Sequence, residues 1–231
     1  MPEPTSRPRL IIFDVNETLS DMRPLAGRFA AVGAPEHLAA TWFAGLLRDG
    51  FALTVTGDNP AFSSLGSASL RGLLHDVVRD VDTAVDHIMA GFSALPVHPD
   101  VVDGVRALAE LGIRLVTLSN GATSVAQGLL ERNGIEDAFE RLLSVQDADR
   151  WKPAATAYAY ALRTTGVEAS DAMLVAVHPW DIHGAHEAGL ATCWLDRGAG
   201  PYPAYFADAD VVASSLTDLA ARLAVLEPGG R

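Results

Sequence analysis

The feature that most constrains this chain is the alternation of short apolar runs with helical patterns. Five apolar runs of strand length occupy residues 9–13, 113–118, 172–177, 191–195 and 210–213, and a further short one occupies 141–145. Helical patterns separate them, at 100–111, 122–133, 154–165, 182–188 and 216–226. Strands that alternate with helices of this length predict a parallel, doubly wound α/β sheet.

The first two strands are separated by a segment with a different pattern. Residues 22–98 contain no good buried strand and instead show helical periods around 24–32, 36–54, 67–79 and 83–92. An insertion of this length is too long for a simple connection. The pattern therefore predicts an α/β core formed by residues 1–21 and 99–231, and a helical cap domain formed by residues 22–98, with prolines gathered at the linkers.

Composition limits the partners and the compartment. The net charge of −12 disfavours nucleic acid and anionic membranes, because both require a basic surface. No run of about 18 apolar residues predicts a transmembrane helix, and the first ten residues lack the apolar region of a signal peptide. The single cysteine, Cys193, falls in a predicted buried strand, so we expect a structural thiol. These features predict a cytoplasmic protein.

The distribution of basic residues singles out one position. Arginine supplies 16 of the 17 basic residues, and Lys152 is the only lysine. In a chain that uses arginine everywhere else, a single lysine indicates a site that needs a compact ammonium group rather than a planar guanidinium. The alternative is a chance occurrence.

Polar residues follow the predicted strands where the strands end. They occupy positions 14–19, 119–121, 152–153 and 178–181, each after an apolar run. Ligands of doubly wound sheets bind beyond the carboxyl ends of the strands. We therefore expect carboxylates, a lysine, a hydroxyl and an amide to converge in one site. Taken singly, each residue could equally be part of a turn or a helix cap.

These residues, in this order, resemble the motifs of the haloacid dehalogenase superfamily, and more narrowly those of the type II L-2-haloacid dehalogenases. The first motif, Asp-x-x-x-Thr, matches Asp14 to Thr18, and the second matches Ser119-Asn120-Gly121. The lysine motif matches Lys152-Pro153 with Tyr158 following, and the last motif matches Trp180-Asp181-Ile182-His183-Gly184-Ala185. The resemblance covers nearly the whole chain and implies a Rossmann-like core with an inserted helical cap.

The resemblance implies hydrolytic dehalogenation of a short 2-haloalkanoic acid without a metal or other cofactor. Asp14 would attack the carbon that bears the halogen and form an ester. Water would hydrolyse the ester with help from Asp181, while Lys152 would keep Asp14 ionised. The resemblance further implies that Thr18 supports the Asp14 loop and that Asn120 contacts the leaving group. Ser119 and the backbone of Val15 and Asn16 would bind the substrate carboxylate. Phe43, Tyr158 and Trp180 would line or orient the site. Relatives of this type are often dimers, so a homodimer is a further expectation.

Two other functions remain open. One is a Mg²⁺-dependent phosphatase that acts on a small phosphomonoester. Such enzymes usually carry a second aspartate two residues after the nucleophile, which protonates the leaving alcohol. Asn16 occupies that position here and cannot transfer a proton at neutral pH, whereas a halide needs no proton to leave. The other is a non-catalytic relative that binds a small acid, which the intact set of polar residues disfavours.

The sequence departs from the dehalogenase pattern at three places. Glu17 stands where a glycine is common. Phe43 stands where characterised relatives carry a halide-binding arginine, so we expect Arg48 to substitute for it, with Arg23 and Arg28 as other candidates. Ala176 and His178 replace small polar residues before the last motif. His178 is expected either to activate the hydrolytic water or to have a structural role.

Overall fold

The computed structural model describes residues 6–198 and 200–228. The other residues, 1–5, 199 and 229–231, belong to the predicted catalytic core but lie outside the described residues. The main sheet has six strands in the order β4-β3-β2-β5-β6-β7, and every neighbouring pair is parallel. Its strands are β2 (Leu10–Phe13), β3 (Arg114–Ser119), β4 (Arg141–Ser144), β5 (Ala172–Ala176), β6 (Ala191–Leu195) and β7 (Val211–Ala213). The predicted parallel α/β sheet is therefore confirmed.

Strand β2 is central because it pairs with β3 on one side and β5 on the other. Its last residue, Phe13, is in register with Thr117 and Val175. All four residues of β2 are fully buried, which explains why its sequence is continuously apolar rather than alternating. The order of the strands reverses at β2, and doubly wound sheets bind ligands at such a reversal. Asp14, the next residue, therefore leaves the sheet at the position that favours a site.

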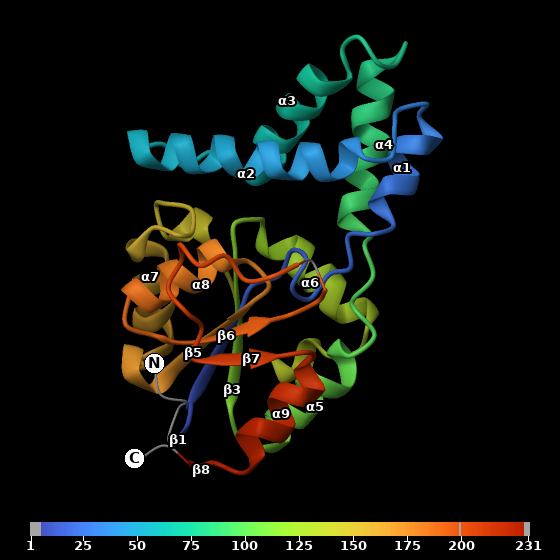
Figure 1. Ribbon diagram of the computed structural model, residues 1–231. Coiled ribbons are helices and arrows are strands. Elements are labelled where there is room, and N and C mark those ends of the chain that lie inside the picture. The colour runs from blue at the N-terminus through green and yellow to red at the C-terminus, as the bar shows by residue number, and fades with distance from the viewer. Residues whose placement is uncertain (1–5, 199, 229–231) are drawn as a thin grey trace.

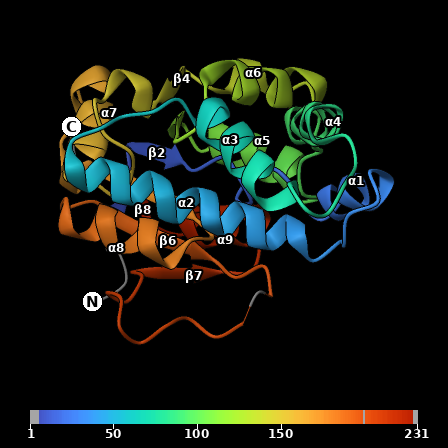
Figure 2. The same ribbon diagram turned by 90° about the horizontal axis from the view of Figure 1, so that it is seen from above.

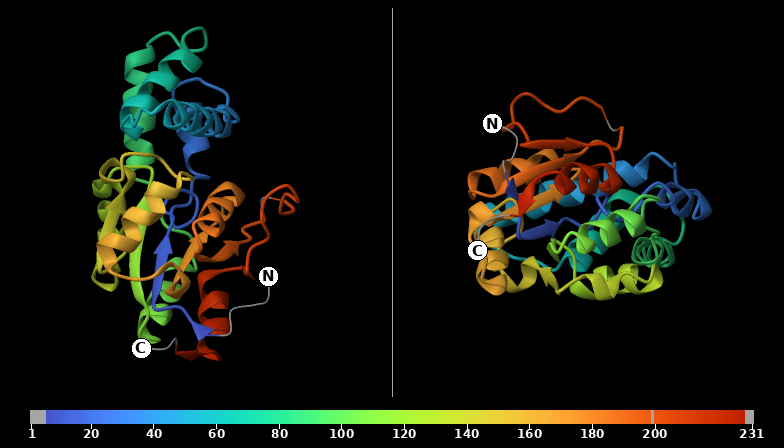
Figure 3. Two further views of the ribbon diagram at one scale, coloured as in Figure 1. Left: turned by 90° about the vertical axis from the view of Figure 1, so that its left-hand side faces the viewer. Right: turned by 90° about the horizontal axis from the view of Figure 1, so that it is seen from below.

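Helices cover both faces of the sheet (Figure 3). Helices α5 (Val101–Glu110), α6 (Thr123–Arg132) and α9 (Leu216–Ala224) pack on the face that includes Ile11 and Phe13. Helices α7 (Ala155–Thr165) and α8 (Pro179–Glu187) pack on the opposite face with Leu10 and Ile12. Helix α8 begins three residues before its predicted start, because Pro179 is well suited to the first turn of a helix.

Two very short strands, which the sequence did not predict, lie at the other end of the molecule. Strand β1 (Ser6–Arg7) pairs in parallel with β8 (Glu227–Pro228). Figure 1 shows this pair at the end of the sheet that is farthest from the cap helices. The described ends of the chain are therefore remote from the residues that follow the carboxyl ends of the strands.

Four helices form the inserted segment and lie across the carboxyl ends of the strands (Figures 1 and 2). They are α1 (Leu25–Ala31), α2 (Leu38–Thr56), α3 (Phe62–Leu74) and α4 (Val81–Ser93). Ser20 and Val97 form an isolated bridge between the two connections to the core. The fold is that of a Rossmann-like core with a helical cap, while the boundaries of the two domains stay a prediction. Within the described ranges, no helix combines the length and the apolar character that crossing a membrane requires.

The predicted cap helix at 67–79 is wrong in its limits, since α3 spans residues 62–74. Ala61 is extended, and the helix begins directly after it, with Phe62 buried. After Leu74 the chain turns, and the Asp80 side chain accepts a hydrogen bond from the Thr83 N–H to start α4. Two sequence signals would have placed α3 correctly. Pro60 disfavours a helical residue just before it, which marks the start of α3, and Asp80 is an N-cap residue, which marks the start of the next helix, α4.

Candidate active site

Asp14 lies directly after β2 and is held by a hydroxyl that the same loop supplies. The Thr18 hydroxyl donates to Asp14 Oδ2 over 2.7 Å and accepts the Val177 N–H over 3.1 Å. The loop thus folds back so that Thr18 joins the end of β5 to the carboxylate. The support of the Asp14 loop that the resemblance implied for Thr18 stays a prediction, and these two contacts are the ones that it would use.

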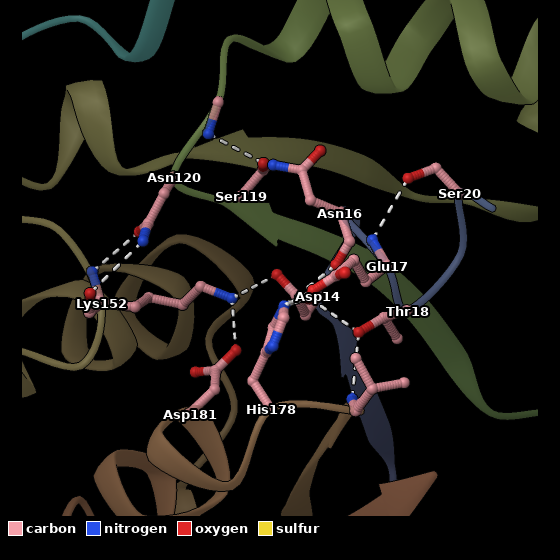
Figure 4. Close-up of polar contacts among 12 residues, drawn as sticks. Asp14, Asn16, Glu17, Thr18, Ser20, Ser119, Asn120, Lys152, His178 and Asp181 are labelled. Atoms are coloured by element: carbon pink, nitrogen blue, oxygen red, sulfur yellow. Dashed lines mark hydrogen bonds and ion pairs between the residues drawn. The ribbon is translucent and has the colours of Figure 1, made fainter. Parts of the chain in front are cut away.

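Lys152 reaches Asp14 from the loop that follows β4. Its Nζ lies 2.9 Å from Asp14 Oδ1 and 2.6 Å from Asp181 Oδ2, and its side chain is fully buried (Figure 4). A buried ammonium group is stable only if it is paired, and two carboxylates surround this one. The only lysine of the chain therefore links the residues that follow β2 and β5.

The charges of this cluster shift the pKa values of its members. Burial on its own raises the pKa of Asp14, but the charges of Lys152 and His178 and the Thr18 hydrogen bond together bring it below its ordinary value. Burial and the charge of Asp14 raise the pKa of Asp181. Burial lowers the pKa of Lys152, but the two carboxylates outweigh that effect and raise it. Of these two carboxylates, Asp14 is therefore the one that ionises more readily.

Two side chains orient the partners of Asp14. The Tyr158 hydroxyl donates to Asp181 Oδ1 over 2.6 Å, which leaves the other carboxylate oxygen for Lys152. The Asn120 side chain accepts the Lys152 N–H over 2.9 Å and donates to the Lys152 carbonyl oxygen over 3.3 Å. Asn120 therefore fixes the backbone of the lysine, a contact that the sequence did not predict.

An apolar pocket lies beside the Asp14 loop, between the core and the cap. Ser119, Val15 and Asn16 line its core side, and the substrate-binding roles that the resemblance implied for them stay predictions. Ser119 Oγ accepts the Gly121 N–H over 2.9 Å, which leaves its hydroxyl hydrogen free to donate. The other lining residues are Phe62, Ser63, Met89, Phe92, Ser93, Gly121, Ala122, Val125 and Ala126. The cap members of this lining carry no motif, so the sequence did not predict them.

His178 and Glu17 lie on another side of Asp14. His178 Nε2 is 3.2 Å from the Asn16 carbonyl oxygen, to which it can only donate, and 3.6 Å from Asp14 Oδ2. Glu17 Oε2 is 3.7 Å from the same nitrogen. Burial raises the pKa of Glu17. Glu17 has a φ of 62°, a left-handed conformation that favours glycine, which explains why glycine is common at this position.

Two predicted aromatic residues lie near His178 rather than in the apolar pocket. The Trp180 ring stacks on His178 with centroids 5.0 Å apart, and the Phe43 ring is 6.3 Å from it. Trp180 also lies 6.0 Å from Lys152 Nζ. Phe43 and His178 line a larger open groove on the Glu17 side of the loop. The expected apolar surroundings of the site are thus present, but Phe43 contributes to this groove instead of the pocket beside Ser119.

The expectation that Arg48 replaces the missing cap arginine is wrong in its geometry. The Arg48 side chain is 76% exposed and pairs with Asp49. Helix α2 buries a stripe that includes Phe43, Leu46 and Gly50, and position 48 falls about halfway round the helix from it. The other candidates also lie elsewhere, because Arg23 is exposed and paired with Asp21, and the Arg28 side chain lies against Gly91. Among the described residues, those that line the apolar pocket include no arginine.

The oxygen atoms around Asp14 do not form a good site for Mg²⁺. Both Asp14 oxygens accept hydrogen bonds, from Lys152 and Thr18, and both Asp181 oxygens accept them from Lys152 and Tyr158. The Asn16 carbonyl oxygen accepts one from His178. Across the part of the chain that the structure describes, no group of three or more His, Cys, Asp or Glu side chains is arranged to hold a metal. An ammonium group already lies between the two carboxylates, where a cation would bind.

Comparison with known proteins places this geometry in a family. The family model of haloacid dehalogenase-like hydrolases matches residues 8–189. Haloacetate dehalogenase H-2 of Moraxella sp. (strain B) is 27% identical over 190 residues, which cover 81% of this chain and 85% of the relative. The (S)-2-haloacid dehalogenase of Pseudomonas sp. (strain YL) is also 27% identical over 190 residues, covering 81% and 82%.

The fold agrees with the sequence comparison. A solved structure of a dehalogenase with an intermediate complex superposes with a TM-score of 0.89 at 25% identity, covering 96% of this chain and 99% of that one. The family match includes Asp14, Lys152 and Asp181, and the structure brings these three side chains into contact. The chain therefore belongs to the haloacid dehalogenase-like hydrolases.

Proposed function

We propose that the protein is a hydrolytic dehalogenase of short 2-haloalkanoic acids that forms a covalent ester on Asp14. One observation carries the proposal: a buried ammonium group holds Asp14 ionised beside an apolar pocket, while Asn16 occupies the place of a general acid. A nucleophile without a proton donor suits a leaving group that departs as a stable anion. The 27% identical relatives named as dehalogenases support the same reaction.

The first half-reaction needs only a carboxylate and an oriented substrate. An Asp14 oxygen attacks C2 of the substrate, the C2–halogen bond breaks, and the halide leaves with the electron pair. Ser119 and the backbone N–H groups of Val15 and Asn16 hold the substrate carboxylate. The second amide hydrogen of Asn120 faces the leaving halide, since its other polar contacts fix Lys152.

The second half-reaction restores Asp14. Water attacks the carbonyl carbon of the ester, and the intermediate collapses to free Asp14 and the 2-hydroxy acid, with release of one proton. Esterification removes the charge of Asp14, so Lys152 is then paired with Asp181 alone. We assign to Asp181 the acceptance of the water proton, and to Tyr158 the orientation of Asp181 through their 2.6 Å hydrogen bond.

His178 has a positioning role in this scheme. Its Nε2 donates to the Asn16 carbonyl oxygen and lies 3.6 Å from Asp14, so that nitrogen carries a proton and cannot serve as a base. Trp180 stacks on the imidazole ring, and the Phe43 ring lies 6.3 Å from it, so both limit its movement. The cofactor-free reaction, the homodimer and the cytoplasmic location stay predictions from the sequence and the resemblance.

Halide release tests the proposed reaction. Wild-type protein and Asp14→Asn are incubated with chloroacetate, bromoacetate, fluoroacetate and 2-chloropropionate in the presence of EDTA. Release by the wild type alone is expected. If neither protein releases halide but the wild type hydrolyses phosphomonoesters with Mg²⁺, the chain is a phosphatase. Loss of turnover on both substrate panels would support a protein that only binds a small acid.

Isotope labelling tests the covalent step separately. In a single turnover with excess protein in H₂¹⁸O, water attacks Asp14 of the ester, so the label is expected in the Asp14 peptide. Direct attack of water on the substrate would instead place the first ¹⁸O atom in the hydroxy acid. Mass spectrometry of both products distinguishes the two routes without any assumption about rates.

A further inference from the structure

Trp151, the residue before the lysine, belongs to the core but is buried against the cap. Its side chain is fully buried, and its indole Nε1 donates to the Pro60 carbonyl oxygen over 3.0 Å. Its backbone N–H donates to the Thr54 hydroxyl over 3.3 Å. The ring stacks on Phe62, with centroids 5.7 Å apart and planes 18° apart. A single core residue thus contacts the end of α2, the loop after it and the start of α3.

The Trp151 ring lies directly on the backbone of α2. A Cβ atom built at Gly50 would be 2.3 Å from the ring, which no real contact allows. Glycine at this position therefore lets the helix approach the ring closely. In Figure 1 the C-terminal end of α2 lies above α7, whereas the connections to the core join the cap at α1 and α4. Trp151 holds the end of the cap that is far from these connections.

The same loop places the catalytic ammonium group. Lys152 is the next residue, and Asn120 fixes its backbone from the core side. Phe62, on which Trp151 stacks, also lines the pocket beside Ser119. We propose that Trp151 is a positioning residue that couples the seating of the cap to the placement of Lys152 and of the pocket wall. The role of Lys152 in this inference rests on the proposed function.

A matched pair of glycines in α2 tests the coupling. Gly50→Ala places a methyl group against the Trp151 ring, whereas Gly45→Ala, in the same helix, meets no atom within 4 Å. Both changes raise helix propensity equally, so they differ only in the contact with Trp151. We expect Gly50→Ala to slow ester formation on the order of 100-fold, since about 1 Å of misplacement can cost that much. Gly45→Ala should remain within about twofold of the wild type.

Two readouts do not depend on turnover. The first is the distance between spin labels at Val55→Cys in the cap and Val225→Cys in the core, since both positions are exposed and the native Cys193 is buried. The second is the titration of the Asp14 carboxyl followed by ¹³C NMR. Gly50→Ala should broaden or lengthen the label distance. It should also raise the pKa of Asp14, because Lys152 moves away while the other neighbours of Asp14 are unchanged.

The outcomes separate this inference from the proposed function. If the wild type releases no halide, the proposed dehalogenation fails, and the label distance and the Asp14 titration still decide the coupling. If Gly50→Ala matches Gly45→Ala in both readouts, the coupling is wrong. If the distance changes while the titration and ester formation do not, Trp151 joins the cap to the core without positioning Lys152, and the proposal is equally overturned.

A second pair of variants applies if Gly50→Ala does not fold. Trp151→Phe keeps a ring on Phe62 but removes the hydrogen bond to Pro60. Trp42→Phe removes a comparable buried hydrogen bond, from Nε1 to the Gly66 carbonyl oxygen, that lies entirely within the cap. We expect Trp151→Phe to slow ester formation about threefold to tenfold and Trp42→Phe to leave it unchanged. Equal effects of the two variants would contradict the coupling.

Discussion

The two sides of Asp14 differ in how closely its neighbours approach. On the side of Lys152, the ammonium group and Asp181 are fully buried and are joined by hydrogen bonds of 2.6–2.9 Å. On the side of His178, the nearest titratable group lies 3.6 Å from Asp14 Oδ2, an oxygen that accepts the Thr18 hydroxyl over 2.7 Å, and the Glu17 side chain is 43% exposed beside an open groove. The first side is fully enclosed, and the second is partly open to solvent at Glu17.

The difference between the enclosed and the open side of Asp14 coincides with how closely the residues on each side follow the family motifs. The residues that follow the dehalogenase pattern form the enclosed side, whereas the departures Glu17 and His178 lie together on the open side. Enclosed charges depend on one another strongly, because burial removes the solvent that would otherwise stabilise them. Changes on the Lys152 side should therefore have much larger effects than changes on the His178 side.

The largest effect is expected from Lys152→Met. The variant leaves two buried carboxylates without their cation, and breaking a buried ion pair in this way costs about 3–5 kcal/mol. Urea unfolding should show that loss, and single-turnover halide release should fall at least about 1,000-fold, since Asp14 is then protonated more readily. Lys152→Arg should not restore the rate, because a planar guanidinium does not fit an enclosed site built for an ammonium group.

The next effect concerns pH. In the proposed mechanism, ester formation needs ionised Asp14, and the surroundings of Asp14 hold its pKa below the ordinary 3.8, so the acid limb of the rate should lie below pH 3.8. The same depressed pKa stabilises the fold above pH 3.8, and this stabilisation is lost as the pH falls through the folded value. In Lys152→Gln, the effect of burial on the pKa of Asp14 is no longer outweighed by the ammonium charge. The acid limb of the rate should therefore move to higher pH. An unchanged limb would show that Lys152 does not set the ionisation of Asp14.

Much of the enclosed side follows from sequence reasoning. The apolar runs predict the strands, and the rule that sites form beyond their carboxyl ends brings Asp14, Ser119, Lys152 and Asp181 together. Their mutual contacts depend on short loops whose lengths leave little freedom. The core strands and helices are predictable for the same reason, because each is a short segment with a clear apolar pattern.

The cap was predictable only in outline. Helical periodicity identifies an amphipathic segment but fixes neither its limits nor the face that meets the core, so Arg48 and the start of α3 were misplaced. Trp151 carries no motif, and its partners Thr54 and Pro60 lie far away in the sequence. Contacts between the cap and the core depend on the relative placement of the two, which periodicity does not encode.

A smaller effect is expected from Tyr158→Phe on the enclosed side. The variant removes the 2.6 Å hydrogen bond to Asp181 without changing the ring that fills the space. Loss of a hydrogen bond to a buried charged group costs about 1.5–3 kcal/mol. Because Asp181 serves the second half-reaction in the proposed mechanism, ester should accumulate, and quenched-flow mass spectrometry should detect it. Equal slowing of both half-reactions would place Tyr158 outside the hydrolytic step.

The smallest effect is expected from Glu17→Gly, on the open side. Glycine adopts the φ of 62° without strain, so the variant should gain stability by about 1 kcal/mol, as a higher urea midpoint. Because Glu17 is 3.7 Å from His178 and makes no hydrogen bond with it, halide release should change by no more than about threefold. Glu17→Gln separates charge from strain, since it removes the carboxylate but keeps the left-handed residue. A loss of activity in both variants, as large as that of Tyr158→Phe, would show that the open side contributes to catalysis through the charge of Glu17 and would remove the contrast between the two sides of Asp14.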